Sequence, residues 1–249
     1  MPALSAAIIS FNEEARIVEC LESLRGVVDE IVLVDSGSTD RTRELAAPLV
    51  DVLVEQPFLG HVQQKNLAAE RASHDWVLSL DCDERLTPEL AASIRAVKGR
   101  LDQHAAWEFT RKTFYVYRWL EHLWYPEWRV RLFDRRRARW GGTNPHDKVV
   151  VSEGTVGRLS GDCLHRSFES VAGHVKTLQT FTDIAAAEML ARGKRVGVLD
   201  PLTHGAWTFF RLYVLQRGFL DGFAGLCACT LSFMHAFVKY AKVYTAQRR

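Results

Sequence analysis

The sequence has few cysteines and little net charge. Its five cysteines form no CxxC pair, and their odd number does not fit a complete disulfide framework. These features argue against a disulfide scaffold or a zinc ribbon and favour a reducing, cytosolic environment. The net charge of +2 is too small to indicate nucleic-acid binding by itself.

Targeting signals and long apolar runs are also scarce. The first residues, MPALSAAIISFNEE, carry no basic segment before a short apolar run, so we expect no signal peptide. The uncharged stretch 222–238 has 17 residues, and a membrane span needs about 20. With 47% hydrophobic and 25% charged residues, the 249-residue chain fits one large α/β domain, or a core domain with an appendage.

The first hundred residues alternate between apolar strands and amphipathic helices. We predict strands at residues 4–11, 30–35, 51–55 and 76–80, and helices at residues 12–26, 40–47, 61–72 and 87–99. Asn12 is a plausible N-cap of the first helix, and Thr87 caps the last one, with Pro88 at its first position. Apolar strands with helices between them predict a mostly parallel sheet covered on both faces.

Acidic and small polar residues follow three of these strands, where ligands of parallel sheets bind. If the chain stays extended after Leu80, Asp81 and Asp83 point to the same side. Together they would form an oxygen cleft for Mg²⁺ or Mn²⁺, completed by a ligand's phosphates. The alternative is a solvated acidic turn, but the position after a buried strand favours the metal site.

Several motifs, in order and spacing, resemble the family 2 glycosyltransferases of the glycosyltransferase A fold. They are AIISFNEEARIVECLESL, EIVLVDSGSTDRT, QKNLA and WVLSLDCDE. Downstream, YPEWRVRLFDRRRARW, NPHDKVVV and GRLSGDCLHRSF are similar to bacterial lipopolysaccharide core β-glucosyltransferases. The resemblance covers nearly the whole chain and implies an α/β fold with a Rossmann-like sheet flanked by helices.

The resemblance implies a donor site for a nucleotide sugar, with UDP-glucose as the expected donor. The residues that match its donor-binding positions are Ser10, Asn12, Glu14, Asp35, Lys65, Asn66 and Asp81. The metal ligands that it implies, for Mg²⁺ or Mn²⁺, are Asp83, Asp81 and His165. A buried structural histidine is the alternative for His165.

Asp147 matches the position of the family's catalytic base, with Glu127 and Asp134 as competing candidates. A loop-anchoring role is the alternative for Asp147. Such a base takes the proton from the acceptor hydroxyl as its oxygen attacks the anomeric carbon. The resemblance implies a single displacement with inversion.

An arginine-rich stretch, RVRLFDRRRAR, lies among aromatic residues in the middle of the chain. A solvated charged face is the common explanation of such a run, but guanidinium groups also bind phosphates and carboxylates. We expect Arg129, Arg131 and Trp128 to contact the acceptor or the leaving diphosphate. The strand-end acids and the small net charge argue against RNA, and an anionic glycolipid acceptor fits better.

The C-terminal part is predicted to be helical. Residues 170–193 read as a long amphipathic helix, and residues 203–249 are rich in aromatic, apolar and basic residues. We expect amphipathic helices in the membrane plane; the alternative is a helical pair packed on the core or on a second subunit. The expected parts are a nucleotide-sugar-binding half (1–110), an acceptor and catalytic half (111–200) and a membrane-associating segment (201–249).

The sequence therefore predicts a metal-dependent, inverting hexosyltransferase, peripheral on the cytoplasmic face of the bacterial inner membrane. Its expected acceptor is a lipopolysaccharide core sugar. A polyprenyl-phosphate sugar synthase is the first alternative. A nucleotidylyltransferase or a non-catalytic membrane scaffold are further ones, although SFNEE replaces the glycine-rich loop that nucleotidylyltransferases usually carry after the first strand.

Overall fold

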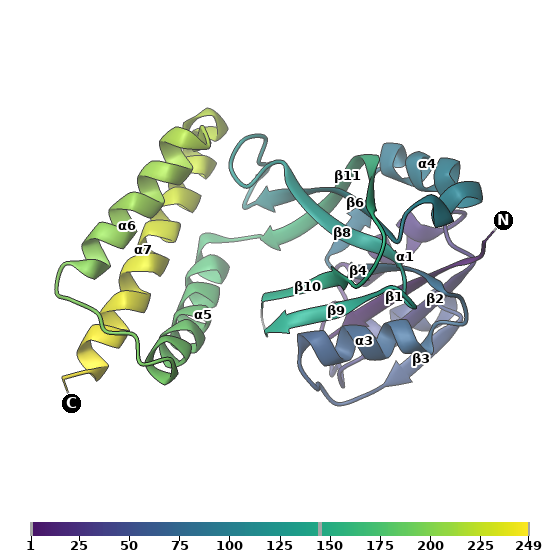
Figure 1. Ribbon diagram of the computed structural model, residues 1–249, viewed down its shortest axis with the longest axis horizontal. Helices are drawn as coiled ribbons and strands as arrows, with labels where there is room; N and C mark the ends of the chain where they lie inside the picture. Colours follow the sequence, from purple (N-terminus) through teal and green to yellow (C-terminus); the bar gives the residue numbers. More distant parts are fainter. Residues whose placement is uncertain (1, 144–145, 249) are drawn as a thin grey trace. The chain divides into compact units, whose positions relative to one another are not determined.

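The structure, a computed structural model, describes residues 2–143 and 146–248 (Figure 1). Its contacts divide the chain into two units, residues 1–111 with 127–165, and residues 112–126 with 166–249. This division differs from the expected boundaries near residues 110 and 200. The reason is that β8, Glu127–Asp134, pairs with β4 and β6 and so joins the sheet of the first unit.

The first unit starts with alternating strands and helices, as predicted. These elements are β1 (Leu4–Ser10), α1 (Ile17–Leu24), β2 (Glu30–Asp35), α2 (Thr42–Ala46), η1 (Ala47–Leu49), β3 (Val52–Glu55), α3 (His61–Arg71), β4 (Trp76–Asp81), β5 (Glu84–Leu86), α4 (Pro88–Val97) and η2 (Lys98–Gln103). The later strands are β6 (Ala106–Tyr115), β7 (Arg118–Trp119), β8, β9 (Ala138–Thr143), β10 (His146–Val151) and β11 (Val156–Phe168).

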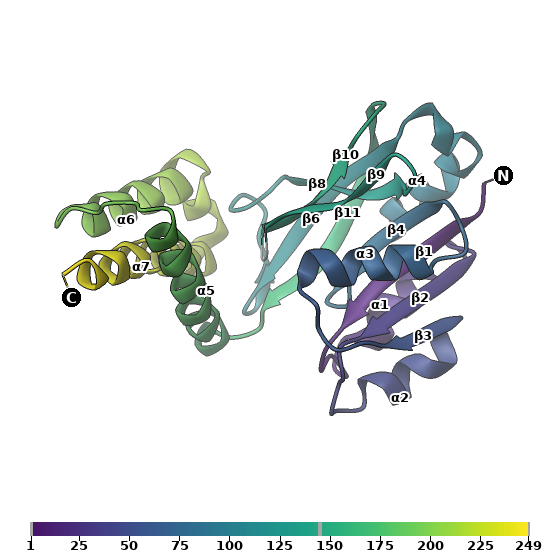
Figure 2. The ribbon, with the colours of Figure 1, turned by 60° about the horizontal axis from the view of Figure 1, so that its bottom comes forward.

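The main sheet is mixed. Its order is β3-β2-β1-β4-β8-β6-β11-β5, and β7 pairs with β6. Strands β3, β2, β1 and β4 are parallel and lie side by side in Figure 2, whereas β8 is antiparallel to both β4 and β6. The α/β fold class is confirmed, with the parallel order confined to the first half of the sheet. β9 and β10 form a separate antiparallel hairpin.

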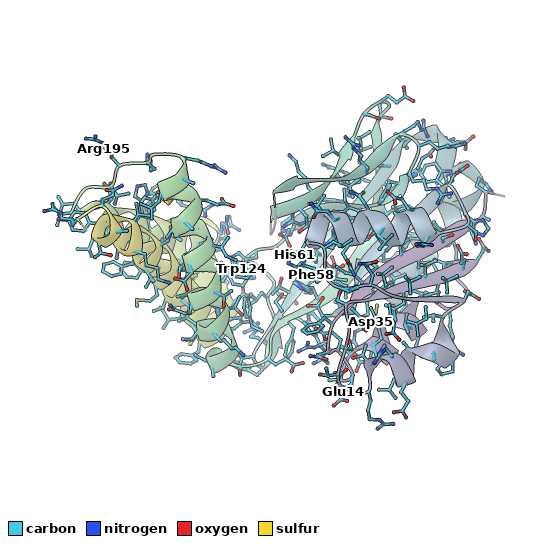
Figure 3. All side chains as sticks on the ribbon, turned by 90° about the horizontal axis from the view of Figure 1, so that it is seen from below. Glu14, Asp35, Phe58, His61, Trp124 and Arg195 are labelled. Atoms are coloured by element: carbon cyan, nitrogen blue, oxygen red, sulfur yellow. The ribbon has the colours of Figure 1, made fainter. Side chains whose placement is uncertain are left out.

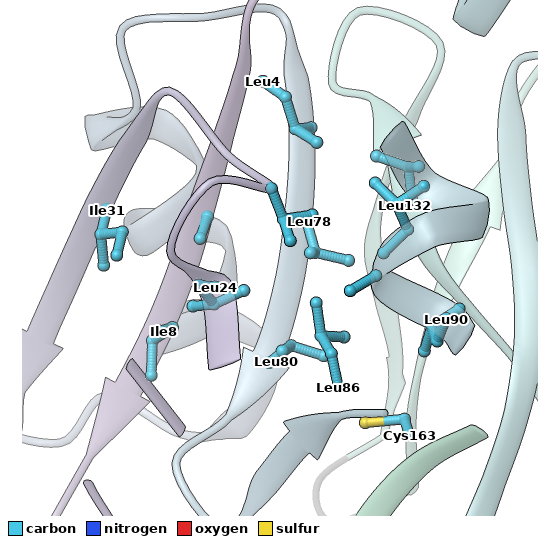
Figure 4. Packing of buried hydrophobic residues seen from close by; sticks show 14 of the residues in the cluster. Leu4, Ile8, Leu24, Ile31, Leu78, Leu80, Leu86, Leu90, Leu132 and Cys163 are labelled. Carbon is cyan, nitrogen blue, oxygen red and sulfur yellow. The ribbon is translucent and has the colours of Figure 1, made fainter. Parts of the chain in front are cut away.

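Alternating side chains bury the two faces of the sheet against different partners. On one face, Ile8 of β1 and Leu78 of β4 belong to a core with α1 and α4 (Figure 4). On the other, Ala7 of β1 packs in a cluster with α3 and the β9–β10 hairpin. Because successive side chains point to opposite faces and both faces are buried, these strands are apolar at nearly every position.

Two helix starts show what local sequence can and cannot predict. Thr87 caps α4 by accepting the Leu90 N–H at 3.2 Å, with Pro88 at the first position, as expected. Asn12 does not cap α1, which begins only at Ile17. Instead, Asn12 takes a left-handed conformation, with φ of 53°, and bonds to the loop after β2.

The second unit contains the predicted long helix, α5 (Val171–Ala191), capped by Ser170. It is followed by α6 (Asp200–Phe210), a π-helical turn η3 (Arg211–Leu215), η4 (Gly218–Asp221) and α7 (Gly222–Ala246). α6 and α7 form a hairpin, and α5 packs on α7. Near this hairpin, His174 is buried, and its Nδ1 lies 3.0 Å from the hydroxyl of Tyr115.

Burial, together with the nearby His235, lowers the pKa of His174 from 6.5 to about 4. The folded state therefore binds a proton less readily than the unfolded state, so stability is lost as the pH falls from about 6.5 toward 4. We expect His174→Gln to reduce this loss by about 2 kcal/mol, a value that allows for solvent screening. Denaturant unfolding at pH 7 and pH 4.5 measures it. The exposed His204→Gln should keep the wild-type pH dependence; equal pH dependence in all three proteins would contradict the assignment.

Candidate active site

Two loops at the carboxyl ends of β1 and β2 are joined through one buried carboxylate. Ser10 and Asp35 are register partners, and the Ser10 hydroxyl donates to Asp35 Oδ2 at 2.7 Å. The Ser38 hydroxyl donates to the same oxygen at 2.5 Å, while the N–H groups of Gly37 and Ser38 donate to Oδ1. Asp35 thus fixes the shape of both loops, and a direct contact with a nucleotide stays a prediction.

Asn12 and Glu14 connect the same two loops. Asn12 Oδ1 accepts the Thr39 N–H at 2.8 Å, and Glu14 Oε2 accepts the Arg41 N–H at 3.0 Å. In Figure 3, Glu14 and Asp35 lie at the same edge of the first unit. The predicted first-loop residues therefore sit together at the expected sheet edge, held by hydrogen bonds from the loop after β2.

The acidic stretch after β4 turns instead of staying extended. Cys82 and Asp83 form the turn between β4 and β5, and Cys82 is buried in the apolar core. Asp81 and Asp83 consequently contact different partners. Asp81 contacts Lys65 and Arg131, whereas Asp83 Oδ2 lies 3.2 Å from His165 Nε2.

Lys65 joins two carboxylates that are far apart in the sequence. Its ammonium lies 2.8 Å from Asp81 Oδ1 and 2.8 Å from Asp147 Oδ2. It also lies 4.3 Å from the centre of the Trp140 ring. Only 6% of the Lys65 side chain is exposed, so little water weakens these interactions. Lys65, which was predicted to bind the donor, therefore joins Asp81 of the DxD motif to Asp147, the predicted base.

A second cation, Arg131, reaches the same carboxylate from β8. Its Nη2 lies 3.3 Å from Asp81 Oδ2 and 3.4 Å from Glu84 Oε1, and its guanidinium lies over the Trp140 ring at 4.8 Å. Its Nε is buried without a hydrogen-bond partner. Glu84 is fully buried and also pairs with Arg111 at 3.3 Å. Glu84 Oε2 accepts the Asp81 N–H at 3.1 Å and so closes the turn.

These contacts decide the charge state of the cluster. Burial by itself would raise the pKa of Asp81, but Lys65 and Arg131 outweigh it and hold that pKa well below its ordinary value. Burial likewise opposes ionisation of Glu84, yet Arg131 and Arg111 lower its pKa overall. Both carboxylates are therefore charged at neutral pH.

Glu127, a competing base candidate, is engaged by two arginines. It pairs with Arg111 at 2.7 Å and with Arg129. Burial would raise the pKa of Glu127, but the hydrogen bond and charge of Arg111 and the charge of Arg129 keep it lowered. Asp134 lies at the other end of β8, opposite Trp76 at the start of β4, and binds Arg136 and Arg137. Asp134 therefore lies beside the start of β4, at the opposite end of that strand from Asp81.

A cavity of about 440 Å³ opens beside this cluster within the first unit. It is lined by Lys65, Asp81, Glu108, Arg111, Trp128, Arg129, Val130, Arg131, Asp147, Lys148 and Val149. Five of these residues are cationic and three are acidic. Trp128 is 39% exposed and stacks on Arg158, whose guanidinium lies 4.5 Å from the ring centre. The cavity therefore combines cations, carboxylates and an aromatic surface.

At the turn after β4, a divalent metal would find two protein ligands, Asp83 and His165. The described residues contain no group of three or more histidine, cysteine or acidic side chains suited to a metal. Asp83 and His165 nevertheless offer one carboxylate oxygen and one imidazole nitrogen 3.2 Å apart, because β11 pairs with β5. The donor set fits Mg²⁺ or Mn²⁺ if phosphate oxygens and water complete the shell.

Other predicted residues have structural partners. Asn66 exchanges two 3.0 Å hydrogen bonds with the backbone of Trp140 and so fastens α3 to β9. The arginine-rich stretch divides. Arg129 and Arg131 line the cavity, whereas Arg135 donates to the carbonyls of Ala69, in the last turn of α3, and Ala72, directly after it. Residues 144 and 145 of the NPHD motif lie outside the described residues.

Glu84, Arg111, Trp140 and Lys148 belong to the site, but no motif in the sequence assigned them a specific role. Glu84 directly follows the DxD motif, which was the one local signal available. Arg111 lies outside the quoted motifs, and Lys148 lies within NPHDKVVV without an assigned role. They reach the cavity because β6 and β10 line it. Trp140, one of the aromatic residues beside the arginine-rich stretch, is buried beneath Lys65 and Arg131.

A mixed α/β sheet with a charged cleft at the carboxyl ends of its parallel strands is the architecture of the glycosyltransferase A fold. The family model "Glycosyl transferase family 2" matches residues 5–151, more than half of the chain. The protein belongs to this family and is a glycosyltransferase.

Relatives of known sequence extend the likeness over nearly the whole chain. An uncharacterized glycosyltransferase of Rickettsia typhi is 29% identical over 254 residues, which cover 98% of this chain and 87% of that protein. The lipopolysaccharide core biosynthesis glycosyltransferase LpsC of Rhizobium meliloti is 29% identical over 248 residues, covering 97% and 92%. Among solved structures, S. aureus TarS matches with a TM-score of 0.51 and 13% identity. That match covers 95% of this chain and 54% of TarS, and it supports the fold alone.

The buried Glu84 makes a testable contribution to stability. Glu84→Gln takes one buried charged partner away from both Arg111 and Arg131, which we expect to cost about 3 kcal/mol of unfolding free energy. Chemical denaturation at pH 7 measures this. Glu89→Gln, at an exposed site on α4, should change stability by less than about 0.5 kcal/mol. If the two variants were equally stable, Glu84 would not be the centre of the network.

Proposed function

We propose that this glycosyltransferase is metal-dependent and inverting, and moves a hexose to a lipopolysaccharide core sugar. UDP-glucose is the donor that we propose first. The observation that carries the proposal is the cavity in which Lys65 holds Asp81 of the DxD motif next to Asp147. The similarity to LpsC supports the acceptor class.

Charge pairing supports a metal requirement. Lys65 and Arg131, which contact Asp81 of the DxD motif, are already paired with Asp81, Asp147 and Glu84. A diphosphate adds negative charge beside these carboxylates. Asp83 and His165 would hold Mg²⁺ or Mn²⁺, which neutralises the leaving diphosphate when bound.

The protein's own side chains supply the remaining steps. Lys65 and Arg131 bind the donor diphosphate, and the shift of Lys65 toward it releases Asp147 Oδ2. Asp147 then accepts the proton of the acceptor hydroxyl as that oxygen bonds to the anomeric carbon and the bond to UDP breaks. One displacement of this kind inverts the anomeric configuration, so an α-linked donor gives a β-linked product.

The acceptor would occupy the outer part of the cavity. The half-exposed face of Trp128 suits a sugar ring, and Arg129 and Lys148 suit the negative groups of a lipopolysaccharide core. Lys148 has no ion-pair partner among the residues that the structure describes. Because such an acceptor is fixed in a membrane, we place the enzyme peripherally on the cytoplasmic face of the bacterial inner membrane.

A donor and acceptor screen tests the proposed function. Nucleotide sugars are supplied with Mg²⁺, Mn²⁺ or a chelator, together with core-truncated lipopolysaccharide or a polyprenyl phosphate. We expect metal-dependent transfer from UDP-glucose to the lipopolysaccharide, with a β-linkage seen by NMR. Transfer to polyprenyl phosphate alone would instead identify a lipid-phosphate sugar synthase, and donor turnover unchanged by the chelator would contradict the metal requirement.

Asp83→Asn tests the metal ligand. The change keeps the side-chain shape and removes one charge, so we expect turnover to fall by about a hundredfold or more with an unchanged fold. The half-saturating Mn²⁺ concentration should rise. Asp102→Asn, at an exposed site in η2, is the control and should behave as wild type. Wild-type turnover and metal dependence in Asp83→Asn would move the metal site elsewhere.

Asp147→Asn tests the base. We expect kcat to fall by roughly a hundredfold to ten-thousandfold, because the proton acceptor is lost. UDP affinity should change little, since the residue acts mainly in the transition state. In contrast, Glu127→Gln should chiefly lower stability, because it breaks the pairs with Arg111 and Arg129. The reverse pattern of kcat losses would assign the base to Glu127.

A further inference from the structure

The bend between α6 and α7 exposes a group of large apolar side chains. It lies at the end of the hairpin opposite the C-terminus, at the top of α6 and α7 in Figure 1. Each of these side chains is 44–66% exposed. We call them the hairpin tip; they are Phe210, Val214, Leu215, Phe219, Leu220 and Phe223.

The exposure follows the helical pattern and is one-sided. At the start of α7, Phe223 and Leu226 are exposed, whereas Ala224, Gly225 and Ala228 are buried. The spacing of the exposed pair, three residues, places both side chains on one face of the helix. The buried face of the bend packs with Leu120 and other residues of the second unit. The hairpin tip is therefore the outer side of a packed element.

Close packing and hydrogen bonds fix the bend. Asp221 is buried, and its carboxylate accepts the backbone N–H groups of Glu121, His122 and Leu123 at 2.8–3.1 Å. A Cβ at Gly225 would lie 1.9 Å from the Gly218 carbonyl oxygen, so only glycine permits this approach. The apolar side chains are therefore held outward by a rigid turn.

The charge of the segment identifies the partner. Residues 201–249 contain one acidic residue, Asp221, which is buried and bound to the backbone. Arg211 and Arg217 lie among the residues of the hairpin tip in the sequence, and both are exposed. A segment that combines exposed aromatic and aliphatic side chains with exposed arginines, and has no exposed acidic residue of its own, fits the interface of an anionic bilayer.

The polar contacts of α7 argue against a complete membrane span. By length and composition, the helix Gly218–Ala246 could cross a membrane, and 33% of its most apolar window is buried. However, Lys242 Nζ lies 2.6 Å from Asp183 and 2.8 Å from the Thr182 hydroxyl of α5. The C-terminal half of α7 is thus tied to α5 by polar groups that a bilayer core disfavours.

We propose that the hairpin tip inserts into the headgroup region of an anionic bilayer, with Arg211 and Arg217 at the lipid phosphates. Insertion of the bend alone leaves the α5–α7 contacts intact. The inference deepens the proposed function, in which the acceptor is a membrane-held glycolipid. Vesicle binding is measured without donor or acceptor, so failure of one proposal is distinguishable from failure of the other.

The test uses the full chain and vesicles of phosphatidylcholine with or without phosphatidylglycerol. Phe219→Ser, Leu220→Ser and Phe223→Ser are combined in one variant. Because these side chains are exposed, the fold should persist, and we expect vesicle affinity to fall about tenfold or more. The matched control combines Val175→Ser, Val198→Ser and Leu199→Ser, which are also exposed in the second unit but lie outside the hairpin tip. It should bind as wild type does.

A charge variant provides an independent measurement. Arg211→Gln with Arg217→Asn should weaken binding to phosphatidylglycerol vesicles and reduce its dependence on salt. Equal vesicle affinity in the wild type and the hairpin-tip variant would overturn the proposal. So would a wild type that binds no vesicles but forms a dimer that the hairpin-tip variant lacks, because a second copy would then cover the surface.

Discussion

One buried ammonium holds the site together. Lys65 on α3 contacts Asp81 at the end of β4 and Asp147 on β10, while its ammonium lies over the ring of Trp140. Without Lys65, two carboxylates would face one another in a place with little water, which is costly. Because α3, β4 and β10 are tied through this group, the position of the proposed base relative to the DxD motif follows from the ion bridge. In the proposed function, the same bridge supplies the cation that binds the donor diphosphate.

The mixed sheet explains why such a site can form. The parallel strands deliver Ser10, Asp35 and Asp81 to one edge, as their register shows. The antiparallel strands then bring cations to that edge, with Arg131 from β8 and Arg111 from β6 both meeting Glu84. Neither half contains a complete site. Each cation offsets the desolvation of a carboxylate from another strand, so the stability of the fold and the geometry of the site depend on the same contacts.

Local sequence signals predicted the parallel half well. The continuous apolar strands, the Thr87 cap and the position of the DxD motif after a buried strand all depend on neighbouring residues, and the structure agrees with them. Asn12 was misassigned as a helix cap because its partners, in the loop after β2, are about 26 residues away. The turn at Cys82 and Asp83 and the central position of Glu84 depend on Arg111, Arg131 and His165, which come from distant strands. Contacts of this kind leave no periodicity in the sequence.

The role of Lys65 can be measured most directly with Lys65→Met, which keeps most of the side-chain length and removes the charge. UDP affinity, by calorimetry in the presence of Mn²⁺, and turnover of UDP-glucose are compared with those of the wild type. The account predicts that UDP affinity falls about tenfold or more, since a charge-assisted contact to phosphate is lost. Turnover should fall further, because the two carboxylates lose their shared partner. A folded Lys65→Met protein with wild-type UDP affinity and wild-type turnover would contradict the claim that this ion bridge organises the site.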